Sequence, residues 1–110
     1  MQLRFREKNR DIFEAIKQGR KKVETRAATQ KYRKISSGDT IFFICGKDSF
    51  KKEVKSVEIF NDIDELLLNH KIKEIAPDIN TKEELEKMYN SFPGYKEKIK
   101  KFGLIALEFK

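Results

Sequence analysis

Side chains suited to chemistry are concentrated between residues 19 and 26, which read GRKKVETR. A helix is expected to end at Gly19, and a strand is expected to follow it. Since side chains alternate between the two faces of a strand, Lys22, Glu24 and Arg26 are predicted to share one face. Lys21 lies at the joint, and its long side chain can reach either face. An acid among cations on a short strand favours a surface cleft that binds a polar, anionic ligand.

These residue types suit the recognition of a phosphate or a base. Arginine presents a planar fork of donors that matches either group, and lysine adds a mobile positive charge. Glu24 can accept a hydrogen bond from an exocyclic amine, or can act as a general base if its pKa is raised. A second interpretation is a structural ion pair, in which Arg26 or Lys22 neutralises Glu24 and fixes the strand. Both interpretations can hold, because an ion pair in a cleft can also bind a ligand.

Residues 31–34, with the sequence KYRK, surround one aromatic ring with cations. This composition is typical of loops that stack a base and neutralise phosphates. The alternative is a solvated loop whose Tyr32 packs against the rim of the fold. The predicted ligand-binding residues are Arg20, Lys21, Lys22, Glu24, Arg26, Tyr32 and Arg33.

Other reactive or aromatic side chains are better explained by packing. The residues Tyr89, Phe92 and Tyr95 have helical spacing, which favours core packing over a platform that stacks bases. His70 is the only histidine and has no partner at ligand spacing, so no metal site or cofactor is predicted. Cys45 lies in an apolar strand and is predicted to be a small core residue.

Positive charge is concentrated in the first third of the chain. Residues 1–34 contain 12 Lys or Arg and 4 Asp or Glu, a net charge of +8, whereas residues 35–110 carry a net charge of −1. Such asymmetry favours an RNA or nucleotide-like anionic partner, although cations can also serve solubility alone.

Length and composition predict a single domain over residues 1–110 in a reducing compartment, the cytoplasm. The chain is long enough to bury a core, and one cysteine cannot form an internal disulfide. No apolar run approaches the ~20 residues of a membrane span, so no membrane partner is predicted.

The chain alternates strands and helices with short connections. Strands are predicted around residues 3–5, 22–26, 40–45, 53–60 and 104–109, with a bulge near Ser56 and with residues 40–45 buried on both faces. Three helices are predicted: one ends at Gly19, and capping boxes open the others at Asp62 and Thr81. Residues 27–34 are predicted to be a loop. An antiparallel hairpin formed by residues 40–45 and 53–60 favours a small curled sheet or barrel over a doubly wound parallel sheet.

With the elements placed, the chain resembles the ASCH domain family, a branch of the PUA-like superfamily of small β-barrels. The resemblance covers nearly the whole chain. It rests on Gly19-x-Lys21-x-x-Glu24-x-Arg26, Gly38-Asp39, the segment YNSFPGY at residues 89–95, and Gly103 before the closing strand. It implies an α+β fold: a mostly antiparallel PUA-like β-barrel of about five to six strands with about three helices at its openings. A cleft lined by Lys21, Glu24 and Arg26 is implied between barrel and helices.

The resemblance also implies what the cleft binds. Members are thought to bind RNA or modified nucleosides, and some are enzymes. One similar bacterial branch hydrolyses N4-acetylcytidine with a Thr nucleophile, a Lys that matches Lys21, and a later Glu. This chain has Glu24 in place of that Thr, and the later Glu falls near Pro77, with Asp78 and Glu74 as the nearest acids.

Two main functional hypotheses follow. The first is an RNA- or nucleotide-binding protein that uses a basic cleft around Lys21, Glu24 and Arg26. The alternative is a hydrolase that acts on a modified nucleoside or RNA, of amidohydrolase or ribonuclease type. In that enzyme Glu24 would be the general base, and Lys21 would stabilise an oxyanion. A protein-binding module is a third class, supported only by the charge asymmetry.

Overall fold

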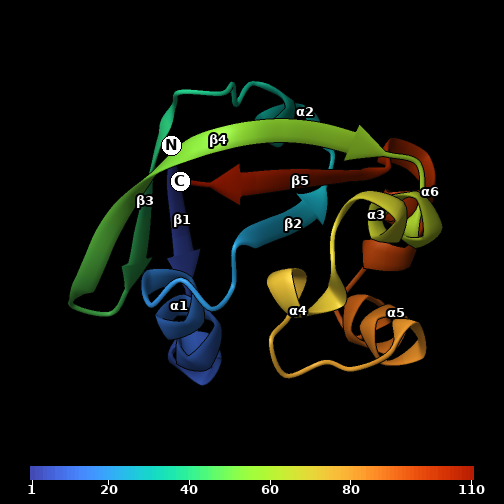
Figure 1. Cartoon of the computed structure of the whole chain (residues 1–110), viewed down its shortest axis with the longest axis horizontal. Coiled ribbons are helices and arrows are strands. Elements are labelled where there is room, and N and C mark those ends of the chain that lie inside the picture. Colours follow the sequence, from blue (N-terminus) through green and yellow to red (C-terminus); the bar gives the residue numbers. More distant parts are fainter.

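The computed structural model describes all residues from 1 to 110, and a five-stranded sheet forms its centre (Figure 1). The strands follow the order β1-β3-β4-β5-β2. β1 pairs with β3 in parallel, and every other pairing is antiparallel. The predicted α+β class with a mostly antiparallel sheet is therefore confirmed. The strands are β1 (Gln2–Phe5), β2 (Val23–Ala27), β3 (Thr40–Cys45), β4 (Asp48–Phe60) and β5 (Leu104–Phe109).

The long strand β4 is the reason the sheet curls. Its first half pairs with β3, and its second half pairs with β5, so it bends from one part of the sheet into the other. A register shift between Val54 and Ser56 interrupts the pairing with β5. This irregularity confirms the predicted bulge, and bulges increase local twist and bending. The result is a half-barrel that stays open between its edge strands, β1 and β2.

The structure has six α-helices where three were predicted. The additional helix α2 lies in the segment that was predicted to be a loop, and α4 and α6 lie where no helix or strand was predicted. α6 follows Gly94, whose φ of 73° suits glycine. Its partly buried Tyr95, Ile99 and Phe102 recur at helical spacing, a signal that could have predicted it. The helices are α1 (Arg10–Lys17), α2 (Gln30–Arg33), α3 (Ile63–Asn69), α4 (Ile72–Ile75), α5 (Lys82–Asn90) and α6 (Tyr95–Phe102), and a 3-10 helix, η1 (Glu7–Asn9), precedes α1.

Both predicted capping boxes begin helices. The Asp62 side chain accepts the Glu65 backbone N–H at 2.9 Å at the start of α3. The Thr81 hydroxyl accepts the Glu84 backbone N–H at 3.2 Å at the start of α5. These caps satisfy backbone donors that a helix leaves free at its first turn, so the sequence signal has a direct physical cause.

Two apolar cores lie on opposite sides of β2 and β5. The first fills the curl of the sheet beneath α1 and includes Phe13, Ile41 and Phe43. The second lies between the sheet and the helices α3 to α6, and includes Leu66 and Leu85. β2 therefore runs between two packed regions, and its alternate side chains belong to different environments.

Strand β3 departs from the prediction that both of its faces are buried. Ile41 and Phe43 point into the first core and are fully buried. Thr40 and Phe42 lie on the other face and are exposed, and Phe42 has an exposed fraction of 46%. The prediction was wrong because β3 has no layer packed against its outer face.

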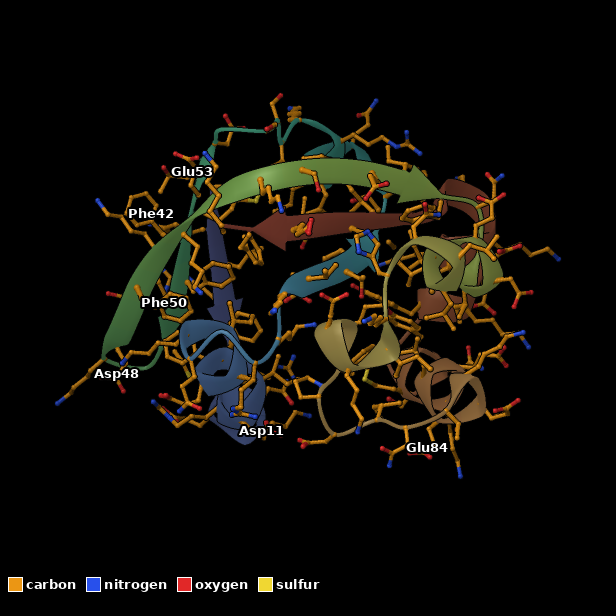
Figure 2. The ribbon with its side chains drawn as sticks, in the orientation of Figure 1. Asp11, Phe42, Asp48, Phe50, Glu53 and Glu84 are labelled. Carbon is orange, nitrogen blue, oxygen red and sulfur yellow. The ribbon has the colours of Figure 1, made fainter.

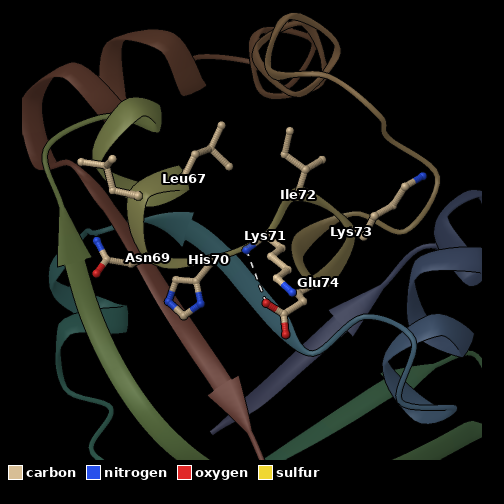
Figure 3. A pocket seen from close by; sticks show the side chains of 8 residues that line it. Leu67, Asn69, His70, Lys71, Ile72, Lys73 and Glu74 are labelled. Carbon is tan, nitrogen blue, oxygen red and sulfur yellow. Dashed lines mark hydrogen bonds between the residues drawn. The ribbon is translucent and has the colours of Figure 1, made fainter.

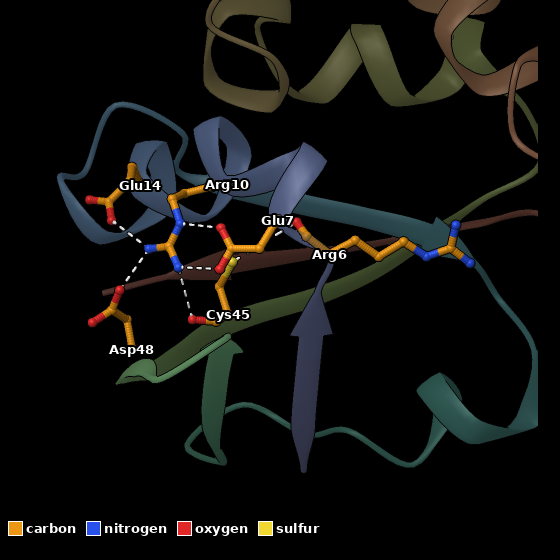
Figure 4. A network of polar contacts seen from close by, with 6 residues as sticks. All are labelled: Arg6, Glu7, Arg10, Glu14, Cys45 and Asp48. Atoms are coloured by element: carbon orange, nitrogen blue, oxygen red, sulfur yellow. Dashed lines mark hydrogen bonds and ion pairs between the residues drawn. The ribbon is translucent and has the colours of Figure 1, made fainter.

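Arg10 joins α1 to the β3–β4 hairpin through a network of polar contacts (Figure 4). Its guanidinium donates to both carboxylate oxygens of Glu7 at 2.7 Å, to Asp48 Oδ2 at 2.7 Å and to the Cys45 carbonyl at 3.2 Å. Glu14 lies 3.8 Å away. The pKa of Arg10 is raised by its hydrogen bonds to Glu7 and Asp48. Cys45 itself is buried, as predicted for a small core residue.

Candidate functional site

The alternation predicted for β2 holds within the strand. Val23 belongs to the second core, and the Thr25 hydroxyl forms a hydrogen bond with the buried Tyr89 hydroxyl on the same side. Glu24 and Arg26 form an ion pair with each other. Lys22 was predicted to share their face, but it precedes the strand and is exposed. Lys21, and not Lys22, is the lysine that lies beside Glu24. Ion-pairing side chains thus gather at the start of β2.

Lys21 is almost fully enclosed, with 6% of its surface exposed. Its ammonium donates to the Val23 carbonyl at 2.8 Å and to the Ile75 carbonyl of α4. The Glu24 Oε1 atom lies 3.6 Å from Lys21 Nζ. Burial lowers the pKa of Lys21, and the nearby Glu24 carboxylate opposes that shift. Lys21 therefore connects β2 to α4 from the interior.

Glu24 is equally buried, and its carboxylate has partners on several sides. Oε1 accepts the Thr25 backbone N–H at 3.0 Å, and Oε2 lies 3.5 Å from Arg26 Nη2. With Lys21 on the remaining side, one buried acid is balanced by two cations. This geometry matches the structural ion pair, with Lys21 in place of the Lys22 partner named from the sequence.

Arg26 extends from this pair toward the open side of the half-barrel. Its guanidinium carbon lies 5.8 Å from the ring centre of Phe5 on β1 and 5.8 Å from that of Tyr32 on α2. Such distances are those of cation–π contacts. Burial lowers the pKa of Arg26, but Glu24 and the neighbouring tyrosines outweigh it, so the pKa is raised. Arg26 is thus a permanently charged link across the gap between β1 and β2.

A hollow of about 300 Å³ opens beside Arg26, between β1, β2 and α2. Three of its side chains are cationic, one is a tyrosine, and none is acidic. The side chain of Arg26 is 24% exposed, and Lys31 Nζ lies 5.4 Å from the Tyr32 ring centre. An electropositive hollow with an aromatic wall suits a ligand that has both a planar ring and a negative charge. The lining residues are Gln2, Leu3, Arg4, Arg26, Lys31 and Tyr32.

Two other predicted ligand-binding arginines have partners within the protein. Arg33 donates to the Ala28 carbonyl at 2.6 Å and to the Phe102 carbonyl at 2.8 Å, and so ties α2 to the end of α6. Arg20 is exposed and donates to the Gln18 side chain at 2.9 Å. Neither residue lines the hollow.

Sequence reasoning missed Gln2 and Arg4 as site residues. They belong to β1, which is far from β2 in the strand order, and only the curl of the sheet brings the two strands to one opening. No local pattern in residues 2–5 indicates that neighbourhood. Lys31, in contrast, belongs to the basic segment that the sequence had singled out.

A second hollow, of about 570 Å³, lies at the junction of α3 and α4 (Figure 3). All of its lining comes from residues 67–74, including the exposed Leu68. His70 is one of the lining residues, and its Nε2 atom lies 2.8 Å from Glu58 Oε1 on β4. The structure contains no group of three or more His, Cys, Asp or Glu side chains arranged to hold a metal. Its lining combines the acid Glu74 with Lys71 and Lys73, so its charge is mixed, whereas the first hollow has no acidic lining residue.

The aromatic residues near the end of α5 pack inside the protein. Tyr89 is 1% exposed in the second core, and Phe92 and Tyr95 pack against the same core. The rings of Phe92 and Tyr95 meet edge to face, with centres 5.3 Å apart. The interpretation as core residues is confirmed for Tyr89.

A family model described as the ASCH domain matches residues 9–110 of this chain. The chain belongs to the ASCH domain family. This membership confirms the resemblance found in the sequence, and the curled, mostly antiparallel sheet is the architecture which that resemblance implied.

Two solved structures are similar to this ASCH domain over their whole length. The crystal structure of hypothetical protein PH0355 shares 33% identity with a TM-score of 0.84, and the match covers 100% of this chain and 98% of that one. The solution NMR structure of protein PF0455 from Pyrococcus furiosus shares 32% identity with a TM-score of 0.77, covering 100% of this chain and 96% of that one. No protein with a curated description matches the sequence. No helix of this ASCH domain has the length and apolar character needed to cross a bilayer.

Proposed function

We propose that this ASCH domain protein binds RNA or a nucleotide in the hollow between β1, β2 and α2. The observation that carries the proposal is the convergence of Arg4, Arg26 and Lys31 with Tyr32 around one opening that has no acidic lining residue. Phosphate groups favour clustered cations, and an unpaired base favours an aromatic surface. The ASCH family is also one that is often linked to RNA binding.

The lining residues divide into groups with different tasks. Arg4 and Lys31 are exposed and free to approach phosphate oxygens. Tyr32 supplies a ring for a base, and the Gln2 amide supplies a donor and an acceptor for a base edge. Arg26 is held in place by Glu24, so its donors are oriented before a ligand arrives. Lys21 and Glu24 act in this proposal by positioning Arg26.

The hydrolase alternative remains a prediction from the sequence. Glu24 as general base and Lys21 as oxyanion donor both lie below the surface, and neither lines the hollow. A positioned base commonly contributes about 100-fold or more to turnover, so Glu24→Gln should abolish most hydrolysis if that activity exists.

The expected compartment is still the cytoplasm, because the chain has one cysteine.

Fluorescence anisotropy with a labelled short oligouridylate tests the binding proposal. Affinity should fall as salt rises, and Arg4→Gln and Lys31→Gln should each weaken binding and reduce the log–log salt slope by about 1. Lys87→Gln is the matched control, because Lys87 is an exposed lysine on the distant helix α5. Unchanged binding by both hollow variants would contradict the assigned site, and salt-independent binding would contradict the proposed electrostatic mode.

A further inference from the structure

The outer face of the sheet carries an aromatic side chain that the fold does not use. Phe42 has an exposed fraction of 46%, although it lies in the middle of β3 (Figure 2). Its neighbours in sequence, Ile41 and Phe43, fill the first core. Large apolar side chains scattered singly are normal at a surface, so exposure alone assigns no role to Phe42. The residues beside Phe42 on the adjacent strands indicate its role.

Polar and cationic residues flank Phe42 across the sheet. The strand pairings place Gln2 of β1 on one side of Phe42 and Lys51 of β4 on the other. Arg4 lies two residues farther along β1, beside Ile44. Residues paired in register point to the same face of a sheet, so Gln2 and Lys51 lie on either side of Phe42. Glu53, opposite Thr40, shares this face and forms an ion pair with Lys110. An aromatic ring among cations on an open sheet face is a surface on which nucleic-acid bases stack.

This face continues directly into the hollow. Gln2 and Arg4 line the hollow, and they also border Phe42 and Ile44 on the outer face. Only strand β1 separates the two sites, and neighbouring strands are about 4.8 Å apart. A chain bound in the hollow therefore passes next to Phe42 if it leaves across β1.

We propose that the outer face of β1, β3 and β4 binds a second nucleotide of a single-stranded RNA, whose base stacks on Phe42. This inference rests on the proposed function, and it names the ligand class as a single-stranded oligonucleotide. Arg4 lies between the two nucleotides and binds the phosphate that links them, and Lys51 binds the phosphate on the far side of Phe42. A duplex does not fit this assignment, because its base faces are covered by neighbouring bases.

A second copy of the chain is the competing occupant of an exposed phenylalanine. The charge on the face disfavours it, since a self-complementary contact centred on Phe42 would bring Lys51 and Arg4 of both copies together. An anionic chain gains from the same cations. The polyanionic ligand is therefore the better complement.

Anisotropy titrations of the oligouridylate with Phe42→Ala test the inference. Loss of one stacked base should weaken binding about five-fold or more. Ile59→Ala is the matched control, because Ile59 is 44% exposed on β4 and borders neither Phe42 nor the hollow. Binding of heparin, an anion without bases, should be equal in the parent and Phe42→Ala. Lys51→Gln should reduce the salt slope by about 1, whereas Phe42→Ala should leave the slope unchanged.

Each other outcome overturns a defined claim. If Phe42→Ala binds RNA like the parent while Lys31→Gln is weakened, the second nucleotide site is wrong and the hollow remains. If the parent binds no RNA, both proposals fail. If sedimentation shows a parent dimer that Phe42→Ala dissociates, a second copy covers the face and the inference is overturned. Circular dichroism should show that Phe42→Ala keeps the parent fold.

Discussion

The Lys21 ammonium donates a hydrogen bond to the Ile75 carbonyl, which joins two segments that are 54 positions apart in the sequence. The same ammonium contacts the Val23 carbonyl and approaches the Glu24 carboxylate. A residue that the sequence marks as a ligand-binding cation is thus an interior connection between β2 and α4. The contribution of Lys21 to the free energy of unfolding can therefore be measured separately from any contribution to ligand binding.

Replacing Lys21 with methionine should destabilise the protein strongly. The substitution leaves buried carbonyl groups without a donor and removes one of the two cations beside Glu24. The free energy of unfolding should fall by about 3 kcal/mol, as is typical when one partner of a buried pair is removed. Lys22→Met is the control, since Lys22 is exposed, and it should change the value by less than about 0.5 kcal/mol. Urea denaturation measures both, and equal effects would refute the interior role of Lys21.

Lys21 and Glu24 should also be energetically coupled. Glu24→Gln leaves the buried Lys21 and the partly exposed Arg26 as neighbouring cations with no carboxylate between them, so it should destabilise by about 3 kcal/mol. In the double variant with Lys21→Met, the measured loss of unfolding free energy should be smaller than the sum of the two single-variant losses, by about 1 kcal/mol or more. Additive losses in urea denaturation would show that the two charges do not interact.

Tyr89 should make stability depend on pH in the alkaline range. Burial raises the pKa of Tyr89, and its hydroxyl is bonded to Thr25. An unfolded chain ionises its tyrosines near pH ~10, whereas the folded protein keeps Tyr89 protonated. The stabilisation from this phenol is therefore complete below that pH and is lost as pH rises toward the raised pKa, at about 1.4 kcal/mol per pH unit.

Tyr89→Phe isolates this effect. The difference in unfolding free energy between the parent and the variant should be constant below about pH 9 and should shrink above about pH 10. Tyr95 and Lys21 are present in both proteins, so their titrations cancel in the difference. A difference that stays constant up to about pH 11 would mean that Tyr89 ionises as freely in the folded protein as in the unfolded chain.

Arg10→Gln should loosen the end of the β3–β4 hairpin. The variant loses the contacts from the guanidinium to Asp48 and to the Cys45 carbonyl, which hold the hairpin against α1. Amide hydrogen exchange at residues 45–48 should become faster, while the second core keeps its protection. Lys8→Gln, an exposed change in the neighbouring 3-10 helix, serves as the control. Equal exchange in the two variants would exclude a bracing role for Arg10.

Local signals predicted the starts of two helices and the bulge, because the causes of these features are local. Asp62 and Thr81 cap helices through backbone groups three residues away, and the bulge lies close to Ser56, as expected. The outer face of β3 was mispredicted because the apolar run at residues 40–45 does not say what covers each face. Phe42 is exposed despite that run.

The site could be predicted only in part, for the same physical reason. Arg26 and Tyr32 were named from their types and neighbours, and both line the hollow. Arg4 was not named, because its role depends on the curl that brings β1 near β2. The depth of Lys21 was also not predictable, since the Ile75 carbonyl that receives it belongs to a helix far along the chain.

The strand order has a mechanical consequence. β1 and β2 follow one another in sequence but form the opposite edges of the sheet. In a flat sheet four strand spacings would place these edges about 19 Å apart. The segment through α1 acts as a tether that limits how far the edges can separate, and the Arg26–Phe5 contact joins the two edge strands from inside. A circular permutant opened within residues 18–21 would lose that tether, so its half-barrel should widen and its hollow should become shallower.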